Sequence, residues 1–164
     1  VTVIVLDRPR HDKLVAEIRN VGARIKMISD GDILGALSTC FDYSGVDILM
    51  GIGGAPEGVL SAAALKCIGG EIQGVLNPIN DEHRKRCEEM GADCEKVYKT
   101  DDLVMGDEVI FAATGVSYGE LLEGVKYNEN NMASTHSLVL RAETGTIRFI
   151  KSTHKLDKKP EYAK

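Results

Sequence analysis

Short apolar runs alternate with amphipathic segments along the first half of the chain. The short runs are typical of buried strands, and the apolar residues of the amphipathic segments recur at helical spacing. In chain order, the pattern predicts strands over residues 1–6, 24–28 and 46–50 and helices over residues 12–21, 30–40 and 60–67. This alternation is typical of an α/β fold, a layered structure in which helices cover both faces of a largely parallel sheet.

The next segment extends the same series and then becomes strongly polar. Residues 71–76 predict a fourth strand, and the mostly charged residues 81–90 predict a helix. Asn80 is suited to be the N-cap of that helix, and Gly91 is suited to end it. Because the helix carries so many charges, we expect it to lie on the surface.

The pattern changes beyond residue 107. We expect a fifth strand over residues 108–113 and a hairpin of residues 137–141 and 146–150 around Glu143-Thr144-Gly145. The sheet is therefore predicted to be mostly parallel at first and mixed toward the C-terminus. Residues 1–151 form one predicted folded unit, and the polar, lysine-rich residues 152–164 form a predicted poorly ordered tail.

Length, composition and charge narrow the class of protein. The 164 residues suffice for one domain, but a strand begins at Val1 with no methionine before it, which we interpret as a chain cut at a domain seam. The chain is 43% hydrophobic and has no apolar run of about 20 residues, which excludes a membrane span. Its net charge of −5 disfavours nucleic acid as a partner. No secretory leader is visible, so we expect a cytoplasmic protein.

The cysteines and histidines do not favour a zinc site. The four cysteines include no C-x-x-C motif, and the four histidines have no spacing typical of zinc ligands. We therefore predict reduced thiols. These eight residues are Cys40, Cys67, Cys87, Cys94, His11, His83, His136 and His154.

Candidate chemistry lies in three loops, each directly after one of the first three predicted strands. They are the arginine loop (Arg8-Pro9-Arg10), the aspartate loop (Asp30-Gly31-Asp32) and the glycine loop (Gly51 to Gly58). The carboxyl ends of parallel strands lie at one edge of a sheet, and ligands of such folds bind there. The sequence therefore predicts that the three loops converge.

Each loop has a structural and a functional interpretation. The two arginines suit a phosphate but are also common on solvated surfaces. One aspartate of Asp30-Gly31-Asp32 could cap a helix, which leaves the other to accept hydrogen bonds from sugar hydroxyls or to bind a cation. Glu57 could stabilise a helix N-terminus or bind a metal ion.

The glycine loop matches neither the P-loop nor the dinucleotide-binding pattern, although its backbone amides could face an anion. Together the three loops predict a site for a phosphorylated polyol with a divalent cation. Phosphoryl chemistry with two metal ions needs more carboxylates than these loops offer.

Five segments resemble the carboxyl-terminal half of class II fructose-1,6-bisphosphatases, and the resemblance covers nearly the whole chain up to about Lys151. They are LDRPRH (6–11), DGD (30–32), GVDILMGIGGAPEGVLSAAALKCIGGEIQG (45–74), GDEVIFAATGVSYGELLEGV (106–125) and THSLVLRAETGTIR (135–148). The resemblance implies the carboxyl-terminal lobe of a sugar phosphatase, similar to fructose bisphosphatases and inositol phosphatases. It also implies hydrolysis of the 1-phosphate of fructose 1,6-bisphosphate to fructose 6-phosphate, dependent on Mn²⁺ or Mg²⁺.

The same resemblance implies roles for individual residues. The family's substrate contacts fall on Arg8, Pro9, Arg10, Asp30, Gly31, Asp32 and Gly54, and one metal ligand falls on Glu57. Some relatives have lysine in place of Arg8. The family's remaining metal carboxylates belong to the amino-terminal lobe, so the resemblance assigns no catalytic residue here and implies that this chain alone is inactive.

The resemblance also bears on context and partners. It implies a place in gluconeogenesis or, in photosynthetic bacteria, in the Calvin cycle with possible sedoheptulose 1,7-bisphosphate activity. The expected partners are a sugar bisphosphate, the amino-terminal lobe and, from base rates, a second copy of the chain in a homo-oligomer. Two alternatives stay open, namely a non-catalytic module that binds sugar phosphates and another inositol- or sugar-phosphate phosphatase.

Overall fold

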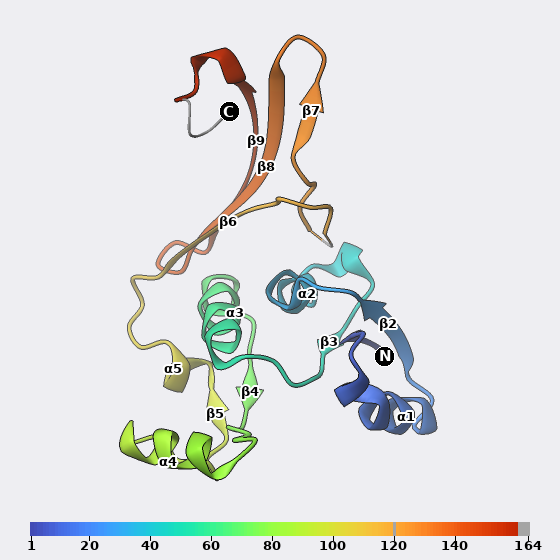
Figure 1. Ribbon diagram of the computed structural model, residues 1–164, viewed down its shortest axis with the longest axis vertical. Coiled ribbons are helices and arrows are strands. Elements are labelled where there is room, and N and C mark those ends of the chain that lie inside the picture. The colour runs from blue at the N-terminus through green and yellow to red at the C-terminus, as the bar shows by residue number, and fades with distance from the viewer. Residues whose placement is uncertain (120, 161–164) are drawn as a thin grey trace.

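The computed structural model describes residues 1–119 and 121–160 and has an α/β architecture with parallel and antiparallel sheets (Figure 1). A parallel sheet at the amino-terminal end and an antiparallel sheet at the carboxyl-terminal end lie on either side of a pair of helices. A small two-stranded sheet stands apart from both. The predicted fold class is confirmed, although the strands are divided among separate sheets. No helix in the described part of the chain is long and apolar enough to cross a membrane.

The parallel sheet has the strand order β2-β1-β3. Its strands are β1 (Thr2–Leu6), β2 (Arg24–Ile28) and β3 (Ile48–Leu49), and they match the first three predicted strands, although β3 is shorter than expected. Val3 of the central strand pairs with Ile25 of β2 and with Ile48 of β3. Because all pairs are parallel, the loops that follow these strands lie at one edge.

Two helices cover opposite faces of this sheet, as the pattern predicts. From α1 (Asp12–Asn20), Val15 and Ile18 pack on Val3 and Val5 of β1. On the other face lies α2 (Asp32–Ser38), where a methyl group added to Gly35 would lie 3.0 Å from Leu49 Cδ1 and 3.1 Å from Ile28 Cδ1. Glycine therefore allows close approach of α2 to the sheet.

The main core lies between the helices and the antiparallel sheet. The helix α3 (Ala55–Ile68) packs beside α2, and Ala64 and Cys67 of α3 contact buried residues of the sheet. The sheet consists of β6 (Ile110–Thr114), β7 (Lys126–Asn128), β8 (Met132–Arg141) and β9 (Thr146–Lys155). The buried cluster at its centre is formed by Leu37, Ala64, Cys67, Phe111, Leu122, Leu138 and Leu140.

The predicted hairpin is present but longer than expected. β8 and β9 pair from Arg141 with Thr146 to Met132 with Lys155, well beyond the predicted residues. The residue pairs beyond the predicted hairpin are largely polar. A strand prediction based on apolar residues therefore ended before them. Residues 152–158, predicted as part of a poorly ordered tail, instead complete β9 and form a short 3-10 turn, Leu156–Lys158. The expectation for residues 161–164 lies outside the described residues.

The fourth predicted strand does not join the parallel sheet. Only β4 (Gln73–Gly74) forms, and it pairs antiparallel with β5 (Tyr98–Lys99). α3 carries the chain away from β3, so the next strand cannot pair with the parallel sheet (Figure 1). The surface helix α4 (Asp81–Glu89) follows, and its His83 N–H donates to Asn80 Oδ1 at 2.8 Å, which confirms Asn80 as the N-cap.

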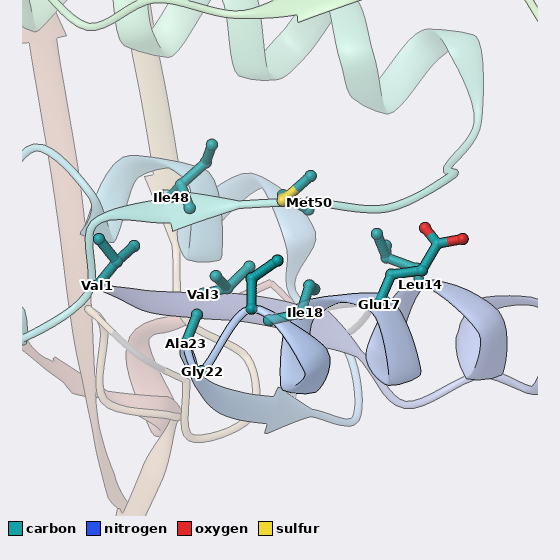
Figure 2. A pocket seen from close by; sticks show the side chains of 10 residues that line it. Val1, Val3, Leu14, Glu17, Ile18, Gly22, Ala23, Ile48 and Met50 are labelled. Carbon is teal, nitrogen blue, oxygen red and sulfur yellow. The ribbon is translucent and has the colours of Figure 1, made fainter.

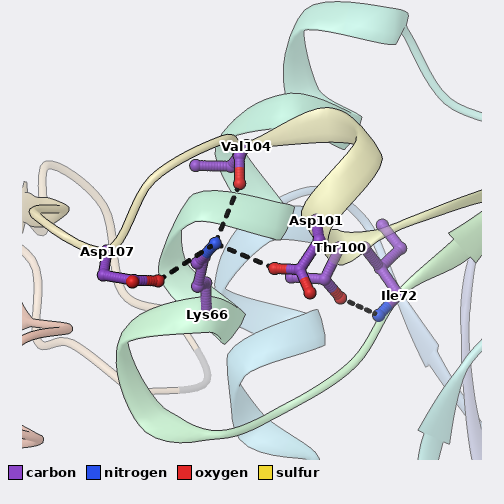
Figure 3. A network of polar contacts seen from close by, with 6 residues as sticks. All are labelled: Lys66, Ile72, Thr100, Asp101, Val104 and Asp107. Atoms are coloured by element: carbon purple, nitrogen blue, oxygen red, sulfur yellow. Dashed lines mark hydrogen bonds and ion pairs between the residues drawn. The ribbon is translucent and has the colours of Figure 1, made fainter.

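A lysine of α3 connects the two-stranded unit to the core (Figure 3). Lys66 Nζ donates to Asp101 Oδ1 at 2.8 Å and to the Val104 C=O at 3.0 Å, and it lies 3.9 Å from Asp107 Oδ1. These partners belong to or follow α5 (Thr100–Leu103). The Lys66 side chain is only 14% exposed, so its contacts hold the segment after β5 against α3.

Truncation of a core leucine tests this packing. We expect Leu138→Ala to lower the free energy of unfolding by about 2–5 kcal/mol, because Leu138 is 0% exposed in the main cluster. Ile147→Ala on the neighbouring strand removes a side chain that is 41% exposed and should cost less than about 1.5 kcal/mol. Urea denaturation monitored by circular dichroism measures both values, and equal losses would contradict this placement of the core.

Candidate functional site

The three chemistry-bearing loops lie together at the carboxyl ends of the parallel strands. Arg10 Nε donates to the C=O of Ile52 at 2.9 Å, which joins the arginine loop to the glycine loop. The aspartate loop meets the glycine loop at Gly53, where an added methyl group would lie 3.3 Å from Asp32 Oδ2. The convergence expected from the alternation of strands and helices is therefore present in the structure.

The arginine loop forms a short 3-10 turn, Pro9–His11, directly after β1. Pro9 occupies the first turn, where the missing N–H of proline is tolerated. Arg8 is half-buried, and its Nη1 donates to the C=O of Asp7 at 2.7 Å. Arg10 is exposed, and its bond to Ile52 engages Nε, so the terminal nitrogens of its guanidinium keep four N–H donors.

The histidine that follows Arg10 is a site residue that the sequence reasoning missed. His11 is 1% exposed, its Nε2 accepts from the N–H of Ile52 at 2.9 Å, and its Nδ1 lies 2.8 Å from the C=O of Leu6. It therefore links the end of β1 to the glycine loop. The available signal was its place at the end of the segment LDRPRH, between a strand and a helix.

The aspartate loop differs from the expected cap. Gly31, in the left-handed conformation with φ of 80°, is the N-cap of α2, so neither aspartate takes that position. Asp32 is half-buried in the first turn, and its Oδ1 accepts from the N–H of Ile33 at 3.0 Å. Asp30 is exposed.

The glycine loop passes directly into α3, which begins at Ala55. Gly54 is the N-cap, and Pro56 and Glu57 lie in the first turn. A methyl group added to Gly54 would overlap the carboxylate of Glu57, so this carboxylate folds back over the N-cap. Glu57 is exposed at the edge where the loops meet.

The donor chemistry of this edge fits a divalent cation only in part. Glu57 supplies exposed carboxylate oxygens of the kind that Mg²⁺ and Mn²⁺ prefer. Among the described residues, however, no group of three or more His, Cys, Asp or Glu side chains could hold a metal ion. Glu57 could therefore contribute to the binding of such an ion, but the described residues do not supply a complete ligand set.

A separate apolar groove of about 500 Å³ lies between α1 and the sheet (Figure 2). Leu14 and Ile18 of α1 face Val3 of β1 and Met50 across it, and Glu17 is the charged residue of its lining. None of the predicted substrate or metal residues lines this groove. Most residues of the three loops are instead exposed, so together they present an open surface.

Comparison with known proteins adds an independent finding. The family model described as bacterial fructose-1,6-bisphosphatase, glpX-encoded, matches residues 1–154. The chain is 42% identical, over 93% of its length, to the D-fructose 1,6-bisphosphatase class 2/sedoheptulose 1,7-bisphosphatase of Trichodesmium erythraeum. It is also 42% identical, over 95% and 96% of its length, to class 2 fructose-1,6-bisphosphatases of Haemophilus influenzae and Escherichia coli. The chain spans about half the length of these curated relatives, between 48% and 51%.

A pair of glycine substitutions tests the position of the Glu57 carboxylate. Gly54→Ala should displace this carboxylate because the new methyl group takes its place, and stability should change by less than about 1 kcal/mol because φ of −72° suits alanine. Gly58→Ala is the matched control, since a methyl group there meets nothing within 4 Å. The ¹³C chemical shift of Glu57 Cδ should change only in Gly54→Ala, and an unchanged shift would contradict the contact.

Proposed function

The chain belongs to the family of glpX-encoded bacterial fructose-1,6-bisphosphatases, as its motifs predicted, and on that premise we propose that it is the carboxyl-terminal, substrate-binding half of such an enzyme. The reaction is hydrolysis of the 1-phosphate of fructose 1,6-bisphosphate to fructose 6-phosphate. The observation that carries the proposal is the convergence of the arginine, aspartate and glycine loops at one edge of the parallel sheet.

The arginine loop binds the phosphate that is not cleaved. A guanidinium keeps its charge at any physiological pH and can donate paired hydrogen bonds to phosphate oxygens. The bond from Arg10 Nε to the Ile52 C=O orients this guanidinium and leaves its terminal nitrogens for the ligand. Arg8 and Pro9 complete the loop, and the binding energy of this remote phosphate orients the reacting end.

The aspartate loop and Gly54 recognise the sugar. Asp30 and Asp32 accept hydrogen bonds from sugar hydroxyls, and Gly31 between them presents no side chain to the ligand. A substrate without the matching hydroxyls would leave these carboxylates unpaired, which disfavours its binding. Gly54 lets the ligand approach the backbone at the start of α3.

Glu57 is one ligand of the catalytic divalent cation, Mn²⁺ or Mg²⁺. Such an ion lowers the pKa of a bound water molecule and offsets negative charge on the phosphoryl group. The described residues lack a complete ligand set, so the remaining carboxylates come from the amino-terminal half of the enzyme, as the length of the relatives supports. Alone, the chain binds substrate without turnover.

The proposal extends to the setting of the enzyme. The relative from Trichodesmium erythraeum is also named as a sedoheptulose 1,7-bisphosphatase, which supports this sugar as a second substrate. The activity belongs to gluconeogenesis or, in a photosynthetic organism, to the Calvin cycle, and the enzyme is a cytoplasmic homo-oligomer. The second candidate function is a non-catalytic module that binds sugar phosphates, and the incomplete metal-ligand set favours it.

A comparison of two forms of the protein tests the function. One form is the 164-residue chain, and the other carries the amino-terminal half of a class 2 enzyme in the same polypeptide. We expect both forms to bind fructose 6-phosphate and only the longer form to release phosphate from fructose 1,6-bisphosphate with Mn²⁺ present. Turnover by the short form would show that the other half is dispensable.

Two further outcomes of this assay separate the alternatives. Binding without turnover in the longer form would support the non-catalytic module. Preferential hydrolysis of an inositol phosphate would support a different phosphatase.

Replacement of the metal ligand tests the role of Glu57. In the longer form, Glu57→Gln keeps the size of the side chain but removes its charge. It should raise the Mn²⁺ concentration for half-maximal turnover by more than about tenfold. Loss of a residue that only supports a metal ligand already weakens metal binding by about tenfold or more, and loss of a direct ligand should cost at least as much. The control is Glu17→Gln. Glu17 is exposed on α1, and its ion pair with an exposed lysine at 3.8 Å is of a kind that contributes little to stability. An unchanged Mn²⁺ dependence in Glu57→Gln means that the metal assignment is wrong.

A further inference from the structure

Two consecutive residues of the arginine loop hold one residue of the glycine loop. Arg10 Nε donates to the C=O of Ile52 at 2.9 Å, and His11 Nε2 accepts from the N–H of the same residue at 2.9 Å. Both polar backbone groups of Ile52 are thus bound by the turn that follows β1. Arg10 is exposed and can face a ligand, whereas His11 is 1% exposed and cannot.

The partners of His11 define its protonation state. A backbone N–H can only donate, so Nε2 of the ring accepts from Ile52. A backbone C=O can only accept, so Nδ1 carries the hydrogen that is donated to Leu6 at 2.8 Å. The ring is therefore neutral with its proton on Nδ1, and both of its nitrogens are used within the fold.

The glycine loop is shaped to meet this ring. A methyl group added to Gly51 would lie 3.1 Å from both Cε1 and Nε2 of His11. The backbone at Gly51 therefore passes directly over the imidazole, which brings the next N–H onto Nε2. A larger residue at position 51 would push the loop and the ring apart.

We propose that His11 is a positioning residue of the sugar-phosphate site, an inference that rests on the proposed function. It acts through Ile52 and touches no ligand itself. By binding the Ile52 N–H, it sets the start of the glycine loop relative to Arg10, and the same loop leads to Gly54 and Glu57. Loss of this bond leaves a polar N–H without its partner, and the loop moves away from the phosphate-binding arginine.

Two amide substitutions separate the hydrogen bonds of the ring. Asparagine places an N–H group near the position of Nδ1, so His11→Asn keeps the donor to Leu6 and loses the acceptor for Ile52. Glutamine reaches the position of Nε2, so His11→Gln keeps an oxygen acceptor for Ile52 and loses the donor to Leu6. His83→Asn is the matched control, because His83 is exposed on α4, outside the three loops.

The experiment uses the 164-residue chain, with inorganic phosphate and fructose 6-phosphate as probes. Amide hydrogen exchange at Ile52 should be roughly tenfold faster in His11→Asn, since a buried hydrogen bond is lost, and near wild type in His11→Gln. The dissociation constant for each probe, measured by NMR titration, should rise roughly tenfold in His11→Asn and return to within about threefold of wild type in His11→Gln. His83→Asn should change neither quantity. In the wild type, the ¹⁵N spectrum of His11 should show the proton on Nδ1.

Each outcome supports or overturns the inference. Rescue of both readouts by His11→Gln supports it. Equal losses in the two variants, or unchanged probe affinity with faster Ile52 exchange, would show that His11 only stabilises the core. If His11→Asn does not fold, Gly51→Ala takes its place and should weaken phosphate binding as strongly, so unchanged affinity there overturns the inference. If the wild type binds neither probe, the proposed function fails, whereas the Ile52 exchange still reports on the link itself.

Discussion

The burial of the carboxyl-terminal half of α3 is the contact on which the rest of the structure depends. Ala64 and Cys67 lie within the main cluster, and Cys67 Sγ donates to the C=O of Val109 at 3.6 Å. Lys66, on the same turns, binds the segment after β5. A helix is stiff, so the burial of its carboxyl-terminal half also determines where its first turn lies. That turn carries Glu57 and lies next to the arginine and aspartate loops.

The same helix has two environments. Its second half is buried, whereas Val59 and Leu60 near its start are exposed despite being apolar. Burial also raises the pKa of the Cys67 thiol, with desolvation as the main cause, so this cysteine stays protonated and packs as a small apolar group. The chemistry thus lies at the exposed start of an element whose position is determined by the core.

The apolar pattern of the sequence predicted the position of elements that pack locally on one another. β1, β2 and α1 lie almost where the pattern placed them. β1 is buried along its whole length, and α1 buries Val15 and Ile18 at helical spacing. The pattern failed where pairing depends on a distant strand. β4 joined β5 instead of the parallel sheet, and β9 continued through polar residues that pair with β8. Backbone hydrogen bonds between strands hold such segments, and apolar spacing does not report them.

The candidate site shows the same division. From the sequence alone, the alternation of strands and helices was enough to place the arginine, aspartate and glycine loops at one edge, because parallel strands carry their following loops to the same side. Only the tertiary structure decided that Gly31 and not an aspartate caps α2, that the Glu57 carboxylate folds over Gly54, and that His11 binds Ile52. His11 and Ile52 are separated by 41 positions in the chain. A hydrogen bond between a side chain and a backbone N–H that folding brings together leaves no periodic signal in the residues that make it.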